Sequence, residues 1–260
     1  MEEALKFDIS DGIVTLSLNR PKTFNAFNMD IISPLKERLV SIAKDPEVMG
    51  VVITGEGKAF CAGGDLKWLS EYGKSRGEAF HALAAVYHQA ILEIRRMPKP
   101  VVAAIVGMAA GGGFTLALAC DFRVMEASAV LLQGYTTNGL SIDGGGTFML
   151  PRLVGLARAM EIAVFDRPIS ADQALSWGLA TEITDDGKSR EKALEMIKKI
   201  IKRPLSSFAA SKRLLGESFH TSLETELEKE REYLAQCAEH PNAREGMAAF
   251  LEKRKARFNL

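Results

Sequence analysis

Two glycine-rich stretches, residues 59–66 and 107–113, constrain this chain more than any other feature. Each follows an apolar run, residues 51–54 and 101–106, which predicts a strand that ends in a glycine loop. Glycine removes the side chain that would keep a ligand from the main chain. The apolar segment 114–119 predicts a buried helix whose N-terminus adds its positive dipole end. We interpret the two loops as the two halves of an oxyanion site, although tight turns would explain the glycines equally simply.

Further motifs follow one another in a definite order. They are LNRPKTFNAFN at 18–28, GKAFCAGGDL at 57–66, PVVAAIVG at 100–107, GGGT at 144–147, LPRLVG at 150–155, SADQALSWGL at 170–179 and EGMAAFLEKR at 245–254. This order resembles the enoyl-CoA hydratase/isomerase (crotonase) superfamily over nearly the whole chain. The resemblance implies an α/β fold, a crotonase (ClpP-like) spiral of ββα units with a C-terminal helical lobe that completes a trimer.

Composition agrees with this fold. The chain has 260 residues, of which 47% are hydrophobic, enough for one large core. Strand-like runs near 13–18, 51–54, 101–106 and 122–125 alternate with helical stretches near 29–44 and 78–96. Beyond residue 188 the pattern is helical and charged, with helices expected over 191–203, 221–239 and 242–257. We therefore expect a spiral core over residues 1–188 and a helical trimerisation lobe over 189–260.

Charge and cysteine usage exclude several classes of function. Basic and acidic residues balance at 33 each, so nothing indicates a nucleic-acid partner. The three cysteines are odd in number, which favours reduced thiols, and no cluster has the spacing of a metal site. No leader-like start or membrane-length apolar run is present, so we expect a soluble, cytoplasmic protein.

The resemblance identifies the two oxyanion donors and also shows that the catalytic glutamates of the hydratases are absent from this sequence. It implies that the N–H groups of Ala62 and Gly112 hold the thioester oxygen. The two glutamates of the family's hydratases correspond to Thr115 and Tyr135 here. Neither side chain is a carboxylate base, because alkyl hydroxyls and phenols are not ionised near neutral pH. The pair that activates water is therefore missing.

A carboxylate occurs at another position of the site. Asp143 resembles the aspartate with which isomerases of the superfamily move a proton beside the acyl chain, although a turn before glycines would also explain it. His88 and Asp143 together correspond to the base and nucleophile of the family's hydrolytic 4-chlorobenzoyl-CoA dehalogenases, which have tryptophan in place of Tyr135. His88 on an amphipathic helix could equally be a packing residue.

The substrate site is inferred from the same resemblance. Coenzyme A would be part of the substrate, and no separate cofactor is expected. The residues expected to bind it, besides His88 and Tyr135, are Lys22, Phe24, Ala26, Gly63, Gly64, Asp65, Leu66, Phe250 and Lys253. For the last two, simple helix packing and solvent exposure are equally good explanations.

We therefore expect an acyl-CoA enzyme of fatty acid metabolism that isomerises 3-enoyl-CoA to 2-enoyl-CoA through an enolate, with Asp143 as the base. The alternatives are a hydratase or dehydratase of an unusual or cyclic enoyl-CoA, a hydrolytic aryl-CoA dehalogenase, and a non-catalytic acyl-CoA-binding protein. The expected partners are the acyl-CoA substrate and further copies of the chain, as a homotrimer or a dimer of trimers.

Overall fold

Two β-sheets form the centre of the protein, whose computed structural model describes residues 3–259. The larger sheet has the order β1-β2-β3-β4-β6-β9 and the smaller β5-β7-β8. In the larger sheet only β1 and β2 pair antiparallel. The strands are β1 Leu5–Ser10, β2 Ile13–Leu18, β3 Gly50–Gly55, β4 Val101–Ile105, β5 Met108–Ala110, β6 Phe122–Glu126, β7 Val130–Leu132, β8 Ile169–Ser170 and β9 Glu182–Thr184.

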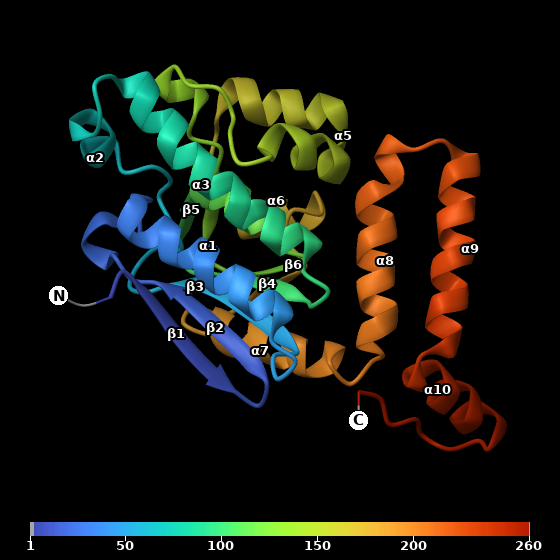
Figure 1. Cartoon of the computed structure of the whole chain (residues 1–260). Coiled ribbons are helices and arrows are strands. Elements are labelled where there is room, and N and C mark those ends of the chain that lie inside the picture. The colour runs from blue at the N-terminus through green and yellow to red at the C-terminus, as the bar shows by residue number, and fades with distance from the viewer. Residues whose placement is uncertain (1–2, 260) are drawn as a thin grey trace.

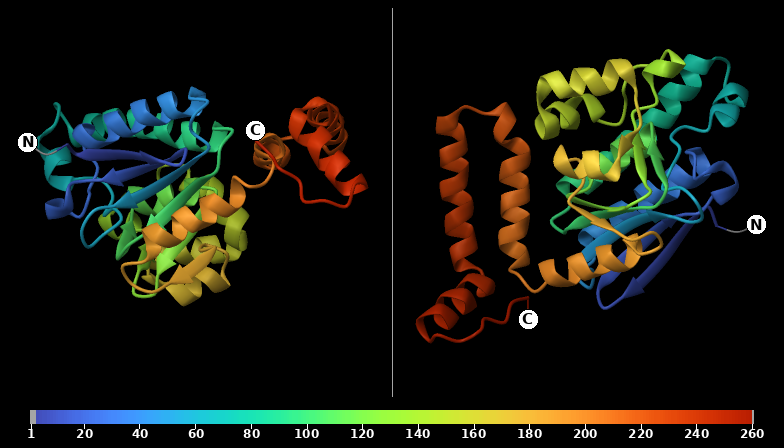
Figure 2. Two further views of the ribbon diagram at one scale, coloured as in Figure 1. Left: turned by 90° about the horizontal axis from the view of Figure 1, so that it is seen from below. Right: turned by 180° about the vertical axis from the view of Figure 1, so that it is seen from behind.

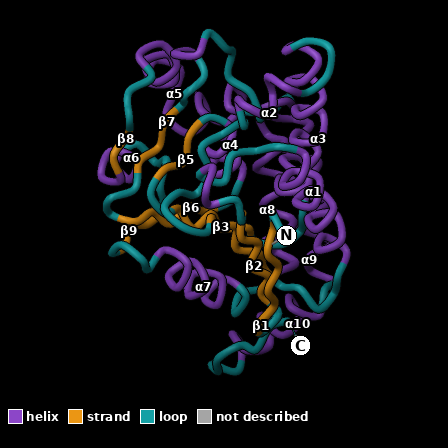
Figure 3. The backbone as a smooth tube through the Cα atoms, turned by 90° about the vertical axis from the view of Figure 1, so that its left-hand side faces the viewer, coloured by secondary structure: helices purple, strands orange, loops and turns teal. Residues whose placement is uncertain are grey.

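From β4 to β7, consecutive strands alternate between the two sheets, and each pair of strands is followed by a helix. β4 lies in the larger sheet, β5 in the smaller, and α4 follows; β6, β7 and α5 repeat the pattern. Figure 3 shows the smaller sheet as a separate row beside the strands of the larger one. This repetition confirms the spiral of ββα units.

Helices cover both faces of the larger sheet (Figure 1). They are α1 Met29–Lys44, α2 Leu66–Glu71, α3 Arg76–Arg96, α4 Gly112–Ala119, α5 Gly146–Phe165, α6 Ala171–Ser176, α7 Ser189–Ile200, α8 Leu205–Glu217, α9 Leu223–Glu239 and α10 Pro241–Leu251. Short 3-10 turns occupy Pro21–Thr23, Thr136–Asn138 and Ser218–His220. Within residues 3–259, none of these helices combines the length and apolarity that crossing a bilayer requires.

Successive side chains of β3 point to opposite faces of the larger sheet and so contact two different layers of helices. Val51 and Ile53 belong to the main core with α1 and α3, whereas Val52 faces a second cluster with Ala193 and Ile197 of α7. Because both faces are covered, β3 is a continuous apolar run.

The helical lobe begins later than the sequence predicts. Since α7 packs on the larger sheet, it belongs to the core, and the boundary falls after α7 rather than at residue 188. Only α8, α9 and α10 project from the core (Figures 1 and 2). The predicted pattern also lacks α8 and extends the last helix beyond its end at Leu251.

One buried ion pair ties the lobe to the core. Lys212 of α8 contacts Asp121 at 2.8 Å, with side-chain exposures of 5% and 9%. The same ammonium group donates to the Ile94 carbonyl at 2.8 Å. Each charge is therefore compensated where water is excluded.

The glycines of the two loops allow backbones to meet. A Cβ atom on Gly113 would lie 2.2 Å from the Cys61 carbonyl oxygen, which is backbone and cannot turn aside. A Cβ atom on Gly77 in α3 would instead find its nearest neighbour, the Ser75 hydroxyl, at 3.9 Å.

We therefore expect Gly113→Ala to lower the free energy of unfolding by about 1–3 kcal/mol, the range for overpacked cores. Gly77→Ala is the matched control and should be neutral or slightly stabilising, since alanine favours helices. Urea denaturation of both variants measures the difference. Equal stabilities would contradict the close approach of the two loops.

Candidate active site

Gly112 lies at the start of α4, and its N–H has no acceptor among the described residues 3–259. The preceding Gly111 has φ 51° and ψ −122°, a conformation that favours glycine. Gly112 is the first helical residue, so its N–H has no acceptor within the helix. It lies among the residues that line a cavity. The structure thus places Gly112 where the sequence predicts a donor.

The second loop lies against this helix start. A Cβ atom on Gly63, whose φ is +92°, would lie 3.2 Å from the Gly112 nitrogen and 3.3 Å from the Gly111 Cα. The Ala110 N–H donates to the Cys61 carbonyl at 2.8 Å and joins the two loops. The predicted convergence of the glycine stretches is present.

Ala62 does not supply the other donor, and this corrects the sequence prediction. Its N–H donates to the Phe24 carbonyl at 2.9 Å, so the group is already used. Two residues further along, Gly64 lines the same cavity as Gly112. Its neighbour Asp65 donates from its N–H to the Phe27 carbonyl, whereas within residues 3–259 the Gly64 N–H has no acceptor. Gly64 is therefore the available partner of Gly112.

The cavity has a volume of about 270 Å³. Phe27, Phe80, Leu83 and Leu140 contribute apolar surface to its wall. Polar groups on the wall come from the two glycines and from His81, Tyr87, Tyr135, Ser141 and Asp143. An apolar chamber with a few placed polar groups is typical of small-molecule sites.

Asp143 and His88 form a pair at the edge of this cavity. His88 Nε2 lies 2.6 Å from Asp143 Oδ1, and the two side chains are 50% and 37% exposed. Asp143 lines the cavity, and the pair joins α3 to the loop before α5. Both residues are candidates from the sequence, and in the structure their side chains are in contact.

Neutral hydroxyl groups occupy the positions of the hydratase glutamates. Thr115 is completely buried, and its Oγ1 lies 2.9 Å from the Tyr87 hydroxyl. That hydroxyl donates to the Gly112 carbonyl at 2.6 Å. Burial raises the pKa of Tyr87 and of Tyr135 well above that of a free phenol. Both phenols therefore stay neutral, and neither is a base near neutral pH.

Cys61 is not a nucleophile in this site. It is fully buried, and burial raises the pKa of its thiol to about 12. Its Sγ accepts from the Gly63 N–H at 3.3 Å. The reactive thiolate form is thus suppressed.

The residues predicted to bind coenzyme A divide into two groups. Phe24, 52% exposed, follows the 3-10 turn Pro21–Thr23, and Leu66, 56% exposed, begins α2. Both segments lie beside the glycine site and include Lys22, Ala26, Gly63 and Asp65. Phe250 is 83% exposed on α10, and Lys253 follows that helix. Figures 1 and 2 show α10 at the far end of the lobe, so these two residues do not join the site of their own chain.

Sequence reasoning missed one wall of the cavity. Phe80, Leu83 and Tyr87 lie on one face of α3, together with Ala84. Their spacing predicts the buried face of an amphipathic helix. The same spacing is expected whether that face packs in the core or lines a cavity. His81, which belongs to none of the sequence motifs, also lines the cavity.

Comparisons with known proteins agree with this geometry. The model of the enoyl-CoA hydratase/isomerase family matches residues 8–260. The chain is 33% identical to a 1,2-epoxyphenylacetyl-CoA isomerase of Escherichia coli K12 over 99% of both chains. It is 34% identical to a crotonyl-CoA hydratase of Syntrophomonas wolfei over 98% of both chains.

Solved structures give the same result. The crystal structure of an enoyl-CoA hydratase from Polaromonas sp. JS666 superposes with a TM-score of 0.93 at 37% identity, covering 98% of this chain and 99% of that one. The fold is that of the crotonases, with converging glycine loops beside the cavity. The chain therefore belongs to the enoyl-CoA hydratase/isomerase family.

Proposed function

We propose that this protein isomerises a 3-enoyl-CoA to a 2-enoyl-CoA. One observation carries the proposal: among the described residues, Asp143 is the one carboxylate that lines the cavity of Gly64 and Gly112. The two N–H groups suit a thioester oxygen, and the carboxylate suits the carbon beside it. The relative that is a 1,2-epoxyphenylacetyl-CoA isomerase supports the broader class of acyl-CoA isomerases.

In the proposed reaction Asp143 takes a proton from C2 of the substrate. The electron pair of the broken C–H bond moves toward the thioester, whose oxygen becomes an enolate oxygen that accepts hydrogen bonds from Gly64 and Gly112. The dienolate then takes the same proton from Asp143 at C4, and the double bond lies between C2 and C3. One base suffices because no water is added.

His88 can hold the carboxylate during this transfer. When its Nε2 carries a proton, it donates to Asp143 Oδ1 and leaves Oδ2 for the substrate. The neutral Thr115 and Tyr135 supply no second base. This supports isomerisation over the hydration that two glutamates carry out.

We expect Asp143→Asn to lower the turnover of a 3-enoyl-CoA by roughly 100-fold or more, the usual contribution of a positioned base. The amide keeps the shape but accepts no proton, so the dissociation constant of the substrate should change little. Ser141→Ala, on the same cavity wall, is the matched control and should keep most of the turnover. Stopped-flow absorbance at the conjugated thioester band, with product masses, measures both.

A variant Asp143→Asn with full turnover would refute the proposal. A product heavier by one water would favour a hydratase or dehydratase of an unusual or cyclic enoyl-CoA. Tight acyl-CoA binding without turnover of any enoyl-CoA would indicate a non-catalytic protein.

The contact between His88 and Asp143 also favours a second candidate, hydrolytic aryl-CoA dehalogenation. Asp143 would attack the halogen-bearing ring carbon and expel chloride, and His88 would then activate the water that cleaves the resulting aryl ester.

We expect no chloride release from 4-chlorobenzoyl-CoA, and no covalent adduct on a His88→Gln variant, because we assign Asp143 to proton transfer. Ion chromatography and intact mass spectrometry measure the two quantities. An adduct that accumulates on His88→Gln but turns over in the parent protein would favour the dehalogenase.

We also infer a homotrimer or a dimer of trimers. An exposed stripe of Leu156, Met160 and Val164 runs along α5, and Leu215 and Leu234 of the lobe are more than 70% exposed. Apolar stripes of this kind mark association surfaces. In such an assembly, Phe250 and Lys253 would reach coenzyme A on a neighbouring subunit.

Sedimentation equilibrium should therefore give three or six times the mass of one chain. A monomer at micromolar concentration would contradict this assembly.

A further inference from the structure

The loop that presents Gly64 is held by hydrogen bonds at nearly every backbone N–H. Phe60 donates to the Val106 carbonyl at 2.7 Å, and Cys61 donates to the Met108 carbonyl at 3.1 Å. Ala62 and Asp65 both donate to the segment 24–27, each at 2.9 Å. From residue 60 to residue 65, Gly64 is the one position whose N–H has no acceptor in the described part of the chain. The direction of the Gly64 N–H therefore depends on how firmly the segment 24–27 is held.

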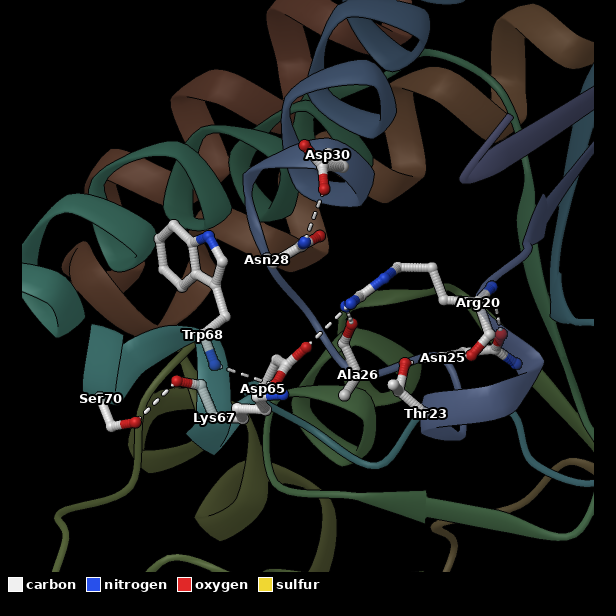
Figure 4. Close-up of polar contacts among 10 residues, drawn as sticks. All are labelled: Arg20, Thr23, Asn25, Ala26, Asn28, Asp30, Asp65, Lys67, Trp68 and Ser70. Atoms are coloured by element: carbon white, nitrogen blue, oxygen red, sulfur yellow. Dashed lines mark hydrogen bonds and ion pairs between the residues drawn. The ribbon is translucent and has the colours of Figure 1, made fainter. Parts of the chain in front are cut away.

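Arg20 joins this segment to the loop (Figure 4). Its Nη2 contacts Asp65 Oδ2 at 2.9 Å, and its Nη1 donates to the Ala26 carbonyl at 2.6 Å. The two side chains are only 21% and 12% exposed. One planar guanidinium thus contacts both the residue after Gly64 and the segment that orients the loop.

Asp65 is held at both oxygens. Oδ1 accepts from the Trp68 N–H at 3.1 Å and caps the start of α2, while Oδ2 faces Arg20. Burial acts to raise the pKa of Asp65, but the hydrogen bonds from Trp68 and Arg20 and the charge of Arg20 outweigh it and lower the pKa. The carboxylate therefore remains ionised, and its charge is satisfied within the fold.

We propose that Arg20 and Asp65 are positioning residues that aim the Gly64 N–H at the thioester oxygen. The inference rests on the proposed function only in requiring an enolate at this site, and it holds for any reaction that passes through one. An oxyanion donor must lie within hydrogen-bond distance of the charge that develops, and a displacement of 1 Å can cost about 100-fold in rate.

The test compares an enolate with a saturated thioester. Acetoacetyl-CoA ionises readily to an enolate with its own ultraviolet absorbance, whereas butyryl-CoA does not. Titrations of both ligands into the parent protein, Asp65→Asn and Arg20→Lys give their dissociation constants. Asp65→Asn keeps the shape but loses the charge, and Arg20→Lys keeps the charge but loses the two-pronged contact. Lys198→Gln, which breaks an exposed pair with Asp11, is the matched control.

We expect both Arg20 and Asp65 variants to bind the enolate roughly 10- to 100-fold more weakly, less than the effect of removing an oxyanion donor, because the misplaced donor is still present. Their butyryl-CoA affinity should change much less, and the control should bind both ligands as the parent protein does.

Three outcomes would contradict the proposal in distinct ways. If the Arg20 and Asp65 variants bound acetoacetyl-CoA and butyryl-CoA more weakly by the same factor, the pair would act in coenzyme binding or folding. If they bound both ligands as the parent protein does, the pair would have no role in the site. If the parent protein binds neither ligand, the proposed function fails as well. Loss of isomerisation in a protein that still prefers the enolate would refute the isomerase but not the role of the pair. Thermal unfolding of each variant identifies any that is not folded.

Discussion

Backbone pairing between the two glycine loops is the constraint on which the site depends. Cys61 donates to the Met108 carbonyl and accepts from Ala110, so the loop after β3 runs beside β5 as a short ladder. This register places Cys61 where a Cβ atom on Gly113 would collide with its carbonyl. Packing thus requires glycine at position 113. The paired loops bring Gly64 and Gly112 to the wall of one cavity.

The polar groups around that cavity differ in kind from one wall to another. On the α4 side, Tyr87 and Thr115 are neutral hydroxyls in a closed hydrogen-bonded cluster. At the opening, Asp143 is the carboxylate and is in contact with His88. A proton can therefore be accepted by Asp143 on the cavity wall and not at Thr115 or Tyr135, which correspond to the hydratase glutamates. This asymmetry favours moving a proton within the substrate over adding water to it.

Much of this could be predicted from the sequence, and the failures are informative. The strand over residues 13–18 and the helix over 29–44 are confirmed by β2 and α1, because their apolar patterns are long and periodic. The resemblance names Gly112, and its N–H is free because the helix expected from the apolar segment 114–119 begins at this residue. The prediction of Ala62 as a donor is wrong. Whether Ala62 or Gly64 has a free N–H depends on where the carbonyls of Phe24 and Phe27 lie. Those carbonyls are placed by a turn in which Phe24 and Asn25 both have positive φ, which no pattern indicates. The membership of α7 in the core likewise depends on Ala193 and Ile197 meeting the sheet, which its charged sequence hides.

The central claim is that one carboxylate moves one proton from C2 to C4. The most direct measurement supplies a 3-enoyl-CoA deuterated at C2 and locates the label in the product by NMR and mass spectrometry. Transfer by Asp143 predicts a 2-enoyl-CoA with a measurable fraction of its deuterium at C4, and loss of both product and label transfer in Asp143→Asn. A product that carries no deuterium at C4, or one that has gained a water, would contradict the account.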